Sequence, residues 1–335
     1  MKELGISASP LNGQTIEGLV QADPNYTFAL RCLLSVFFIV STSVTVLAAE
    51  QPDNLLDPSS IPSATHSSVT SSIGRFFTEG EWYFSWGYNT ETWSPSDIHI
   101  SQPELGNDFT IHNVKGHDEP GWDTGLFNKG LFVPQTNIRI GRFINDERTV
   151  AIELSLDHTK YTSTIGQTAR VSGTINGVSV NSDRVLDENT FRYNLHNGAN
   201  HLMVNIVKRV PLIGKTNESL TLAALGKAGM GLMVPHSSNT VLGKSNEAEV
   251  GPKKFSNYFG TKHGWWQFDG WTAGIEAGVR FVVAKPVYLE LTDKVAYSRL
   301  YDIPVYKGSA DQSLWMNEVI LSLGFTYDGK KLQKK

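Results

Sequence analysis

Residues 81–89 read EWYFSWGYN, and this short stretch decides the fold. Large aromatic side chains occupy every second position, and most of the positions between them are small or polar. A period of two puts the two sets on opposite faces of a β-strand, and no amphipathic helix has this spacing. The aromatic face consists of Trp82, Phe84, Trp86 and Tyr88, and the other face includes Glu81, Ser85, Gly87 and Asn89.

The same alternation recurs along the chain. Residues 149–159, TVAIELSLDHT, place four aliphatic side chains opposite Ala151, Glu153 and Ser155. Six further segments follow this pattern, some less cleanly. The sequence therefore predicts eight strands, at residues 81–89, 136–144, 149–159, 201–210, 219–234, 265–282, 287–298 and 314–327.

The connections between these segments alternate in length. Short turns are expected at 145–147, 211–218 and 284–286. Long polar loops are expected at 94–135, 160–200, 235–264 and 299–313. Short turns at one end and long loops at the other are typical of an eight-stranded antiparallel transmembrane β-barrel, with periplasmic turns and extracellular loops. We expect short hairpins within the loops, one of them turning at Asn176-Gly177.

A soluble eight-stranded barrel or a β-sandwich would show the same alternation, with the apolar face turned inward. The polar face separates the two architectures, because it carries five acidic and five basic residues. Such a balance suits a closed interior where charges must pair, with glycines making room for long side chains. We predict that a charge network fills the barrel interior, formed by Arg139, Glu153, Asp157, Arg209, Lys227, Glu276, Arg280, Glu290, Lys294 and Glu318.

The N-terminal part indicates export. Residues 26–49 carry one arginine before an apolar run and end in two alanines, as in a secretory signal peptide, and Cys32 lies within it. We expect residues 1–49 to be a signal peptide with a long leader, residues 50–74 a flexible Ser/Thr/Pro-rich lead-in, residues 75–327 the barrel and residues 328–335 a basic tail. With a formal net charge of −4, the composition shows no sign of a nucleic-acid partner.

Three segments resemble uncharacterised small outer-membrane β-barrel proteins of Gram-negative bacteria. They are PQTNIRIGRFIND at 134–146, GMGLMVPHSSNTVLGK at 229–244 and LSLGFTY at 321–327. The resemblance covers most of residues 80–327 and implies the fold and a location in the bacterial outer membrane. We expect the partners to be outer-membrane lipid and lipopolysaccharide, and the barrel-assembly machinery during biogenesis. The final strand resembles the signal that this machinery reads, although eight residues follow Tyr327.

One stretch suggests catalysis. His236-Ser237-Ser238-Asn239 resembles the His-x-Ser-Asn stretch of lipid A 3-O-deacylases, which are also eight-stranded barrels. His236 could deprotonate Ser238, and a carboxylate such as Glu249 or Glu247 could hold the imidazole ring. A polar loop after a strand explains the same residues without chemistry.

Aromatic residues and an acidic loop suggest two other kinds of site. GWWQFDGW at 264–271 could stack on sugars, but a membrane-interface girdle explains it better. His117, Asp118, Glu119 and Asp123 could bind a divalent ion, although a solvated loop is the simpler interpretation. We expect no metal and no cofactor. The interfacial aromatic residues are expected to be Trp82, Trp86, Trp265, Trp271, Trp315, Phe325 and Tyr327.

The sequence thus favours an integral outer-membrane barrel with a structural or surface-interaction role and no enzymatic activity. A lipid A ester hydrolase using His236 and Ser238, and a small-solute channel, are the alternative hypotheses. A filled eight-stranded interior argues against a porin-like channel.

Overall fold

The computed structural model describes residues 80–122, 134–195, 197–215, 218–251, 253–254, 256, 259–260 and 264–328. The expected signal peptide, the lead-in and residues 329–335 of the basic tail lie outside these ranges. Within them, no helix is long and apolar enough to cross a membrane.

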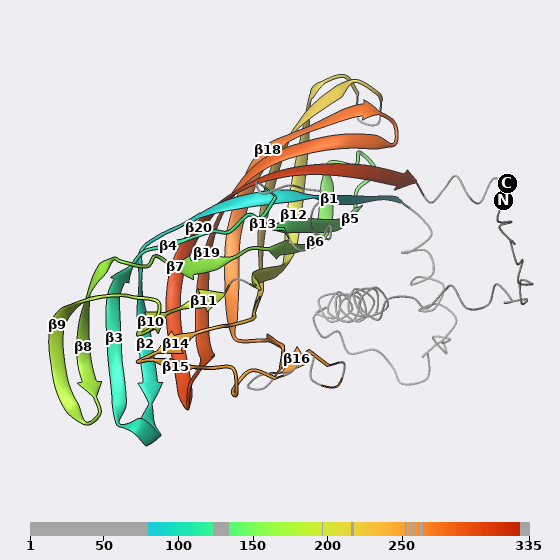
Figure 1. The fold of residues 1–335 in the computed structure, drawn as a ribbon. Helices are drawn as coiled ribbons and strands as arrows, with labels where there is room; N and C mark the ends of the chain where they lie inside the picture. Colours follow the sequence, from blue (N-terminus) through green and yellow to red (C-terminus); the bar gives the residue numbers. More distant parts are fainter. Residues whose placement is uncertain are drawn as a thin grey trace, which may run out of the picture. The chain divides into compact units, whose positions relative to one another are not determined.

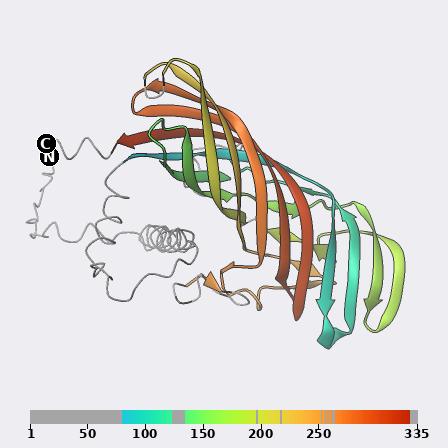
Figure 2. The same ribbon diagram turned by 180° about the vertical axis from the view of Figure 1, so that it is seen from behind.

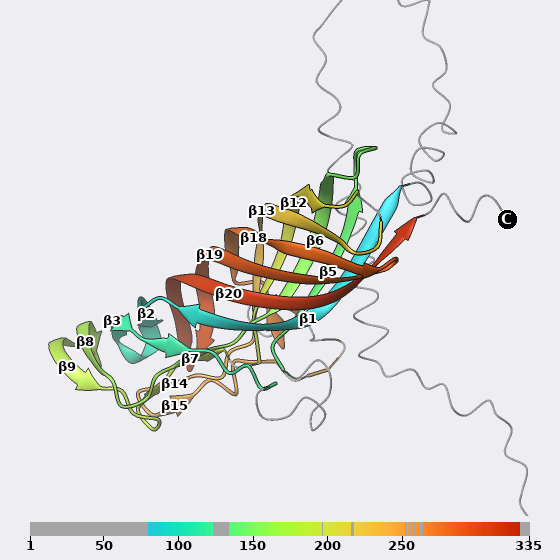
Figure 3. The same ribbon diagram turned by 90° about the horizontal axis from the view of Figure 1, so that it is seen from above.

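Eight antiparallel strands close into a ring, as the alternating sequence predicts. Their order is β1-β5-β6-β12-β13-β18-β19-β20, and β20 pairs back onto β1 from Glu81↔Asp328 to Trp93↔Met316. Figure 3 shows the eight strands side by side around the barrel. The strands are β1 (Glu81–Trp93), β5 (Thr136–Phe143), β6 (Val150–His158), β12 (Ala199–Ile213), β13 (Thr221–Pro235), β18 (Gly270–Ala284), β19 (Val287–Val305) and β20 (Gly308–Asp328). The eight-stranded antiparallel barrel is therefore confirmed.

The two faces of each barrel strand have opposite polarity. On β20, Val319, Leu321 and Leu323 point outward and are exposed, whereas Glu318 and Ser322 are buried. Polar residues inside and apolar residues outside are the reverse of a soluble protein, and they suit a barrel whose solvent is lipid. The soluble barrel and sandwich alternatives are therefore wrong.

Aromatic side chains border the apolar belt at both ends. Trp82 and Tyr327 pair across β1 and β20 near one end, and Tyr297 contacts both Trp271 and Trp315 near the other. Tyr327 lies twelve positions after Trp315 on β20. At ~3.3 Å per residue and a tilt of ~45°, this separation spans roughly 28 Å, close to the ~25 Å apolar band of such barrels.

Three short turns lie at the end of the barrel where β1 begins and β20 ends. They join β5 to β6, β12 to β13 and β18 to β19. Asp328 still pairs with Glu81 and binds Arg148 at 2.8 Å, so this residue belongs to the barrel and not to a tail. We call this the turn end and the opposite end the loop end.

The predicted loop at 299–313 is wrong. Instead, β19 and β20 continue as one long hairpin that turns at Tyr306-Lys307. Leu300, Ile303 and Ala310 in this segment are buried, so the strand pattern continues through the residues that were expected to form a loop.

The projecting part of β20 carries a further sheet. Strand β2 (Ser96–Gln102) pairs with β20, followed by β3 (Asn107–Val114), β8 (Thr168–Ile175) and β9 (Val178–Val185). Figures 1 and 2 show β2, β3, β8 and β9 side by side beyond the barrel. Strands β8 and β9 turn at Asn176-Gly177, where both residues have a positive φ, as a two-residue hairpin requires. We call β2, β3, β8 and β9 the external sheet.

In the external sheet and the adjoining loop end, the side chains of the buried core are apolar, the opposite of the barrel interior. This core includes Trp93, Ile98, Phe109 and Val171. Val234, which the simple alternation assigns to the lipid face, is buried here as well. Water surrounds this part of the chain, so apolar side chains gain by turning inward.

Short elements complete the loop end. They are η2 (Pro103–Leu105), β4 (Gly116–His117), β7 (Tyr161–Ser163), β10 (Phe191–Arg192), β11 (Asn194–Leu195), β14 (Thr240–Val241), β15 (Lys244–Ser245), β16 (Phe259–Gly260) and β17 (Trp266–Gln267).

Candidate functional site

Lys227 is the centre of the charge network in the barrel interior. Its Nζ lies 3.3 Å from Glu153 Oε1, 2.9 Å from Glu276 Oε1 and 2.7 Å from Glu290 Oε1. These residues come from β13, β6, β18 and β19, so one ammonium group links four strands. All four side chains are buried, and the carboxylates have a cation in place of water.

A second group of charges lies around Asp157. Lys294 Nζ lies 2.6 Å from Asp157 Oδ2 and 3.0 Å from Glu318 Oε2. Arg139 also binds Asp157, and its guanidinium reaches Glu153 at 3.7 Å. Arg139 therefore joins this group to the one around Lys227.

A third group lies toward the turn end. Arg280 Nη2 binds Glu290 Oε2 at 2.7 Å, and its guanidinium lies over the rings of Tyr83 and Tyr288. Arg209 donates to the Arg148 carbonyl oxygen and lies 3.9 Å from Glu81. The structure thus places all ten predicted interior charges in buried positions, and all except Arg209 are linked through shared partners.

The sequence interpretation missed several members of this network. Glu81 and Glu91 are buried carboxylates, and Arg148 reaches Glu81 from the turn between β5 and β6. The Tyr83 hydroxyl donates to Glu153 Oε2 at 2.8 Å. Glu81 and Glu91 lie on the inward face of β1, a signal that the alternation of that strand already contained.

The ion pairs run across strands and not along them. Glu276 and Arg280 lie four apart on β18, which is roughly 13 Å of extended chain. Arg280 instead faces Glu290 in the register of β18 and β19, and Glu276 faces Lys294 on one side and Lys227 on the other. The register of neighbouring strands therefore sets some of the partners, and contacts across the lumen, such as those of Lys227 with Glu153 and Glu290, set the others.

Two inward glycines make room for tyrosine rings. A Cβ at Gly141 would lie 2.0 Å from Cζ of Tyr83, and one at Gly324 would lie 2.1 Å from Cζ of Tyr288. Both rings lie flat against a neighbouring glycine, which lets them pack beside the charge network.

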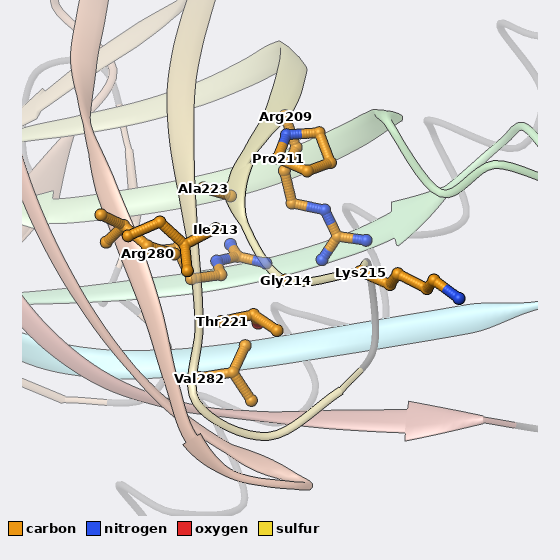
Figure 4. A pocket seen from close by; sticks show the side chains of 10 residues that line it. Arg209, Pro211, Ile213, Gly214, Lys215, Thr221, Ala223, Arg280 and Val282 are labelled. Carbon is orange, nitrogen blue, oxygen red and sulfur yellow. The ribbon is translucent and has the colours of Figure 1, made fainter.

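A basic pocket lies at the turn end of the barrel. It is partly open to solvent, and its lining contains Arg209, Lys215 and Arg280 but no acidic residue. Figure 4 shows the two guanidinium groups among the lining side chains. The paired Arg280 and Glu290 lie buried on the barrel side of it.

The residues of the hypothetical deacylase site have separate partners. His236 is buried, its Nδ1 lies 2.6 Å from the Trp265 carbonyl oxygen, and its ring stacks on Trp265 at 4.0 Å. Glu249 Oε1 accepts from the Lys307 backbone N–H at 3.0 Å, and the Ser238 N–H donates to Asn194. Nδ1 of His236, the ring nitrogen that the carboxylate of a catalytic triad would bind, points instead at a backbone carbonyl group.

We expect the lipid A of cells to be the same with wild-type protein, His236→Ala and Ser238→Ala, because Nδ1 of His236 contacts the Trp265 carbonyl oxygen. Mass spectrometry of lipid A from the three strains checks this. An acyl chain lost with wild type and retained with either variant would contradict this expectation.

The acidic residues of the first loop also have separate roles. Asp118 accepts hydrogen bonds from Thr90 and from the Glu91 N–H, at 2.7 and 3.0 Å. Glu119 accepts from Thr162, and His117 lies 3.3 Å from Thr164. Asp123 lies outside the described residues. Within the described ranges, no three His, Cys, Asp or Glu side chains gather as metal ligands.

The predicted aromatic residues fall into three places. Trp82, Phe325 and Tyr327 lie at the turn end of the belt, and Trp271 and Trp315 lie at its loop end. Trp86 faces outward between the two girdles, paired with Leu323. Trp265 packs in the loops between His236 and Lys253.

The closed ring, its apolar belt and its charged interior together decide the architecture. A closed barrel leaves no strand edge unpaired in lipid, and the belt matches the height of a membrane. The chain is an integral outer-membrane β-barrel protein.

No family model and no curated protein matches the chain. Among solved structures, it is similar to Neisserial surface protein A at 11% identity, with 74% of this chain and 100% of that one covered and a TM-score of 0.33. It is also similar to OprG from Pseudomonas aeruginosa, at 11% identity, 75% and 97% coverage and a TM-score of 0.32. The attachment invasion locus protein Ail of Yersinia pestis shows 14% identity, 74% and 99% coverage and a TM-score of 0.27.

Proposed function

We propose that the barrel acts as a rigid membrane support that holds the external sheet at the cell surface, where the sheet makes contacts. The observation that carries this proposal is the continuity of β20. This strand crosses the membrane belt and then pairs with β2, so the external sheet is hydrogen-bonded directly to the barrel.

The interior supports a mechanical role. The network around Lys227 and Asp157 crosses the lumen from several strands and fixes them relative to one another. Because these paired side chains occupy the lumen of a narrow barrel, no wide aqueous path is expected, and the channel hypothesis loses its physical basis.

The environment of the barrel follows from the same proposal. Lipopolysaccharide surrounds the loop end and phospholipid the turn end, with the aromatic girdles at the two interfaces. The barrel-assembly machinery inserts the chain through β20, whose outward face carries Val319, Leu321, Leu323, Phe325 and Tyr327.

Cysteine labelling tests which end of the barrel faces outside. Cys32 is the only cysteine of the chain and lies in the expected signal peptide. Val178→Cys places a thiol on the external sheet, and Ile144→Cys places one in a turn at the opposite end, both at exposed positions. A membrane-impermeant maleimide should label intact cells carrying Val178→Cys and should label Ile144→Cys only after lysis. The reverse pattern would contradict the proposal.

A further inference from the structure

Three side chains on the outward face of the external sheet form one hydrogen-bonded chain. Asp97 lies on β2, His112 on β3 and Ser172 on β8. Asp97 Oδ2 lies 2.9 Å from Nδ1 of His112, and Nε2 of the same ring lies 2.7 Å from Oγ of Ser172. A carboxylate on one ring nitrogen and a hydroxyl on the other is the arrangement of a serine nucleophile, its base and an orienting acid.

A β-bulge places the His112 side chain beside the Asp97 carboxylate. Between the pairs Ser96↔Val114 and Ile98↔Ile111, Asp97 alone on β2 faces both His112 and Asn113 on β3. Asn113 has a φ of 55°, a left-handed conformation that asparagine tolerates better than most residues. Bulges of this kind often redirect side chains next to functional sites.

The bulge also fixes the carboxylate. The Asn113 N–H donates to Asp97 Oδ1 at 2.8 Å, which leaves Oδ2 for the histidine. Partial burial raises the pKa of Asp97, but the hydrogen bonds from Asn113 and His112 outweigh this and hold the pKa below its usual value. Asp97 is therefore ionised when it orients the ring.

The surroundings of Ser172 offer a positive charge. Ala169 and Val171 are buried, so Arg170 shares the outward face with Ser172. Because Ile111 pairs with Val171, Arg170 is next to His112 in the antiparallel register. Gly173 follows Ser172 with a φ of 130°, and a Cβ there would lie 2.3 Å from the Asp108 carbonyl oxygen, so a side chain at this position is excluded.

We propose that Ser172, His112 and Asp97 hydrolyse carboxylic esters carried by extended, hydroxyl-rich molecules at the cell surface. Ser172 Oγ attacks the ester carbonyl carbon while His112 Nε2 takes the hydroxyl proton. The ester C–O bond then breaks, and the leaving alcohol receives that proton. Water, deprotonated by His112, attacks the acyl-serine, releases the carboxylic acid and restores Ser172.

The substrate class follows from the shape and chemistry of the site. The side chains of His112 and Asp97 are 37% and 58% exposed, so the site is an open face and not an enclosed pocket. Such a face suits a chain laid across the sheet. The outward neighbours His99, Asp108 and Thr110 are polar, which fits an acylated carbohydrate better than a lipid tail. Arg170, which lies opposite Asp183 in the pairing of β8 and β9, is the cation that we assign to the oxyanion.

Active-site labelling tests the nucleophile. Purified full-length barrel in detergent should react with a fluorophosphonate probe and should hydrolyse 4-nitrophenyl acetate faster than buffer does. Ser172→Ala should abolish labelling, and Ser172→Ala and His112→Ala should each lower kcat/KM about 100-fold or more, because nucleophile and base act together. Asp97→Asn should lower kcat with little change in KM, and Asp97→Glu should recover part of it.

The matched control uses the same sheet. Ser179 is an exposed serine on β9. Ser179→Ala should leave labelling and hydrolysis unchanged. All variants should show the same heat-dependent gel migration as wild type, since none of the changed side chains belongs to the buried core. Wild-type protein that neither labels nor hydrolyses, or labelling that persists in Ser172→Ala, would overturn the proposal.

Discussion

Replacing Lys227 by methionine is expected to destabilise the barrel by about 3–5 kcal/mol. The ammonium group is the shared partner of Glu153, Glu276 and Glu290, all three buried. Methionine keeps the volume of the side chain but leaves three carboxylates close together without their central cation. The cost arises from uncompensated charge, because an intact buried pair is by itself a weak source of stability.

Urea unfolding of the refolded barrel in lipid vesicles measures this change. Lys208→Met is the matched control, because Lys208 is an exposed cation on neighbouring β12 and its loss should cost less than about 0.5 kcal/mol. Equal stability of the two variants would mean that the carboxylates around Lys227 are protonated or hydrated, and the ion network would lose its structural role.

Replacing Leu321 by arginine is expected to cost about 2–4 kcal/mol, the cost of a cation near the middle of a bilayer. Leu321 is 58% exposed on the outward face of β20, six positions from both Trp315 and Tyr327. A guanidinium there must lie in hydrocarbon or reach past a girdle to the interface.

Val185→Arg is the matched control for exposure. Val185 is 60% exposed on β9 of the external sheet, where water replaces lipid. Its replacement should change the free energy of unfolding by less than about 0.5 kcal/mol. Folding of purified protein into vesicles of increasing thickness separates the two positions. Equal tolerance of arginine at both would show that the apolar belt does not face lipid.

Much of the barrel could be predicted from the sequence, because the alternation in each strand shows which side chains face lipid and which face the barrel interior. Glu153 between Ile152 and Leu154 indicates a lipid face and an interior face without any knowledge of the partner strands. The lengths of the connections show which end of the barrel carries the long loops and which carries the short turns. Each of these signals is local, so each survives without the tertiary structure.

The partners inside the barrel could not be predicted in the same way. The sequence indicates that Glu276 and Arg280 face inward, but only the register places Arg280 opposite Glu290 and Lys227 opposite Glu276. A shift of one strand by two residues would keep every face and change the ion pairs made by that strand.

The external sheet could not be predicted from the sequence pattern for a different reason. Above the membrane, water replaces lipid, so the apolar face of a strand turns inward. The same alternation therefore leaves Val234 buried and forms strands, not a loop, at residues 299–313.

The sequence by itself determined the eight barrel strands, their lipid-facing sides and the ten charges of the interior. In each strand, consecutive residues alternate between apolar and polar, and this local pattern distinguishes the face in lipid from the face in the interior. Only the tertiary structure decided which charges pair, and that His236 stacks on Trp265. It also brought together Asp97, His112 and Ser172 from three strands. Long-range strand pairing, which no local pattern encodes, is the physical reason.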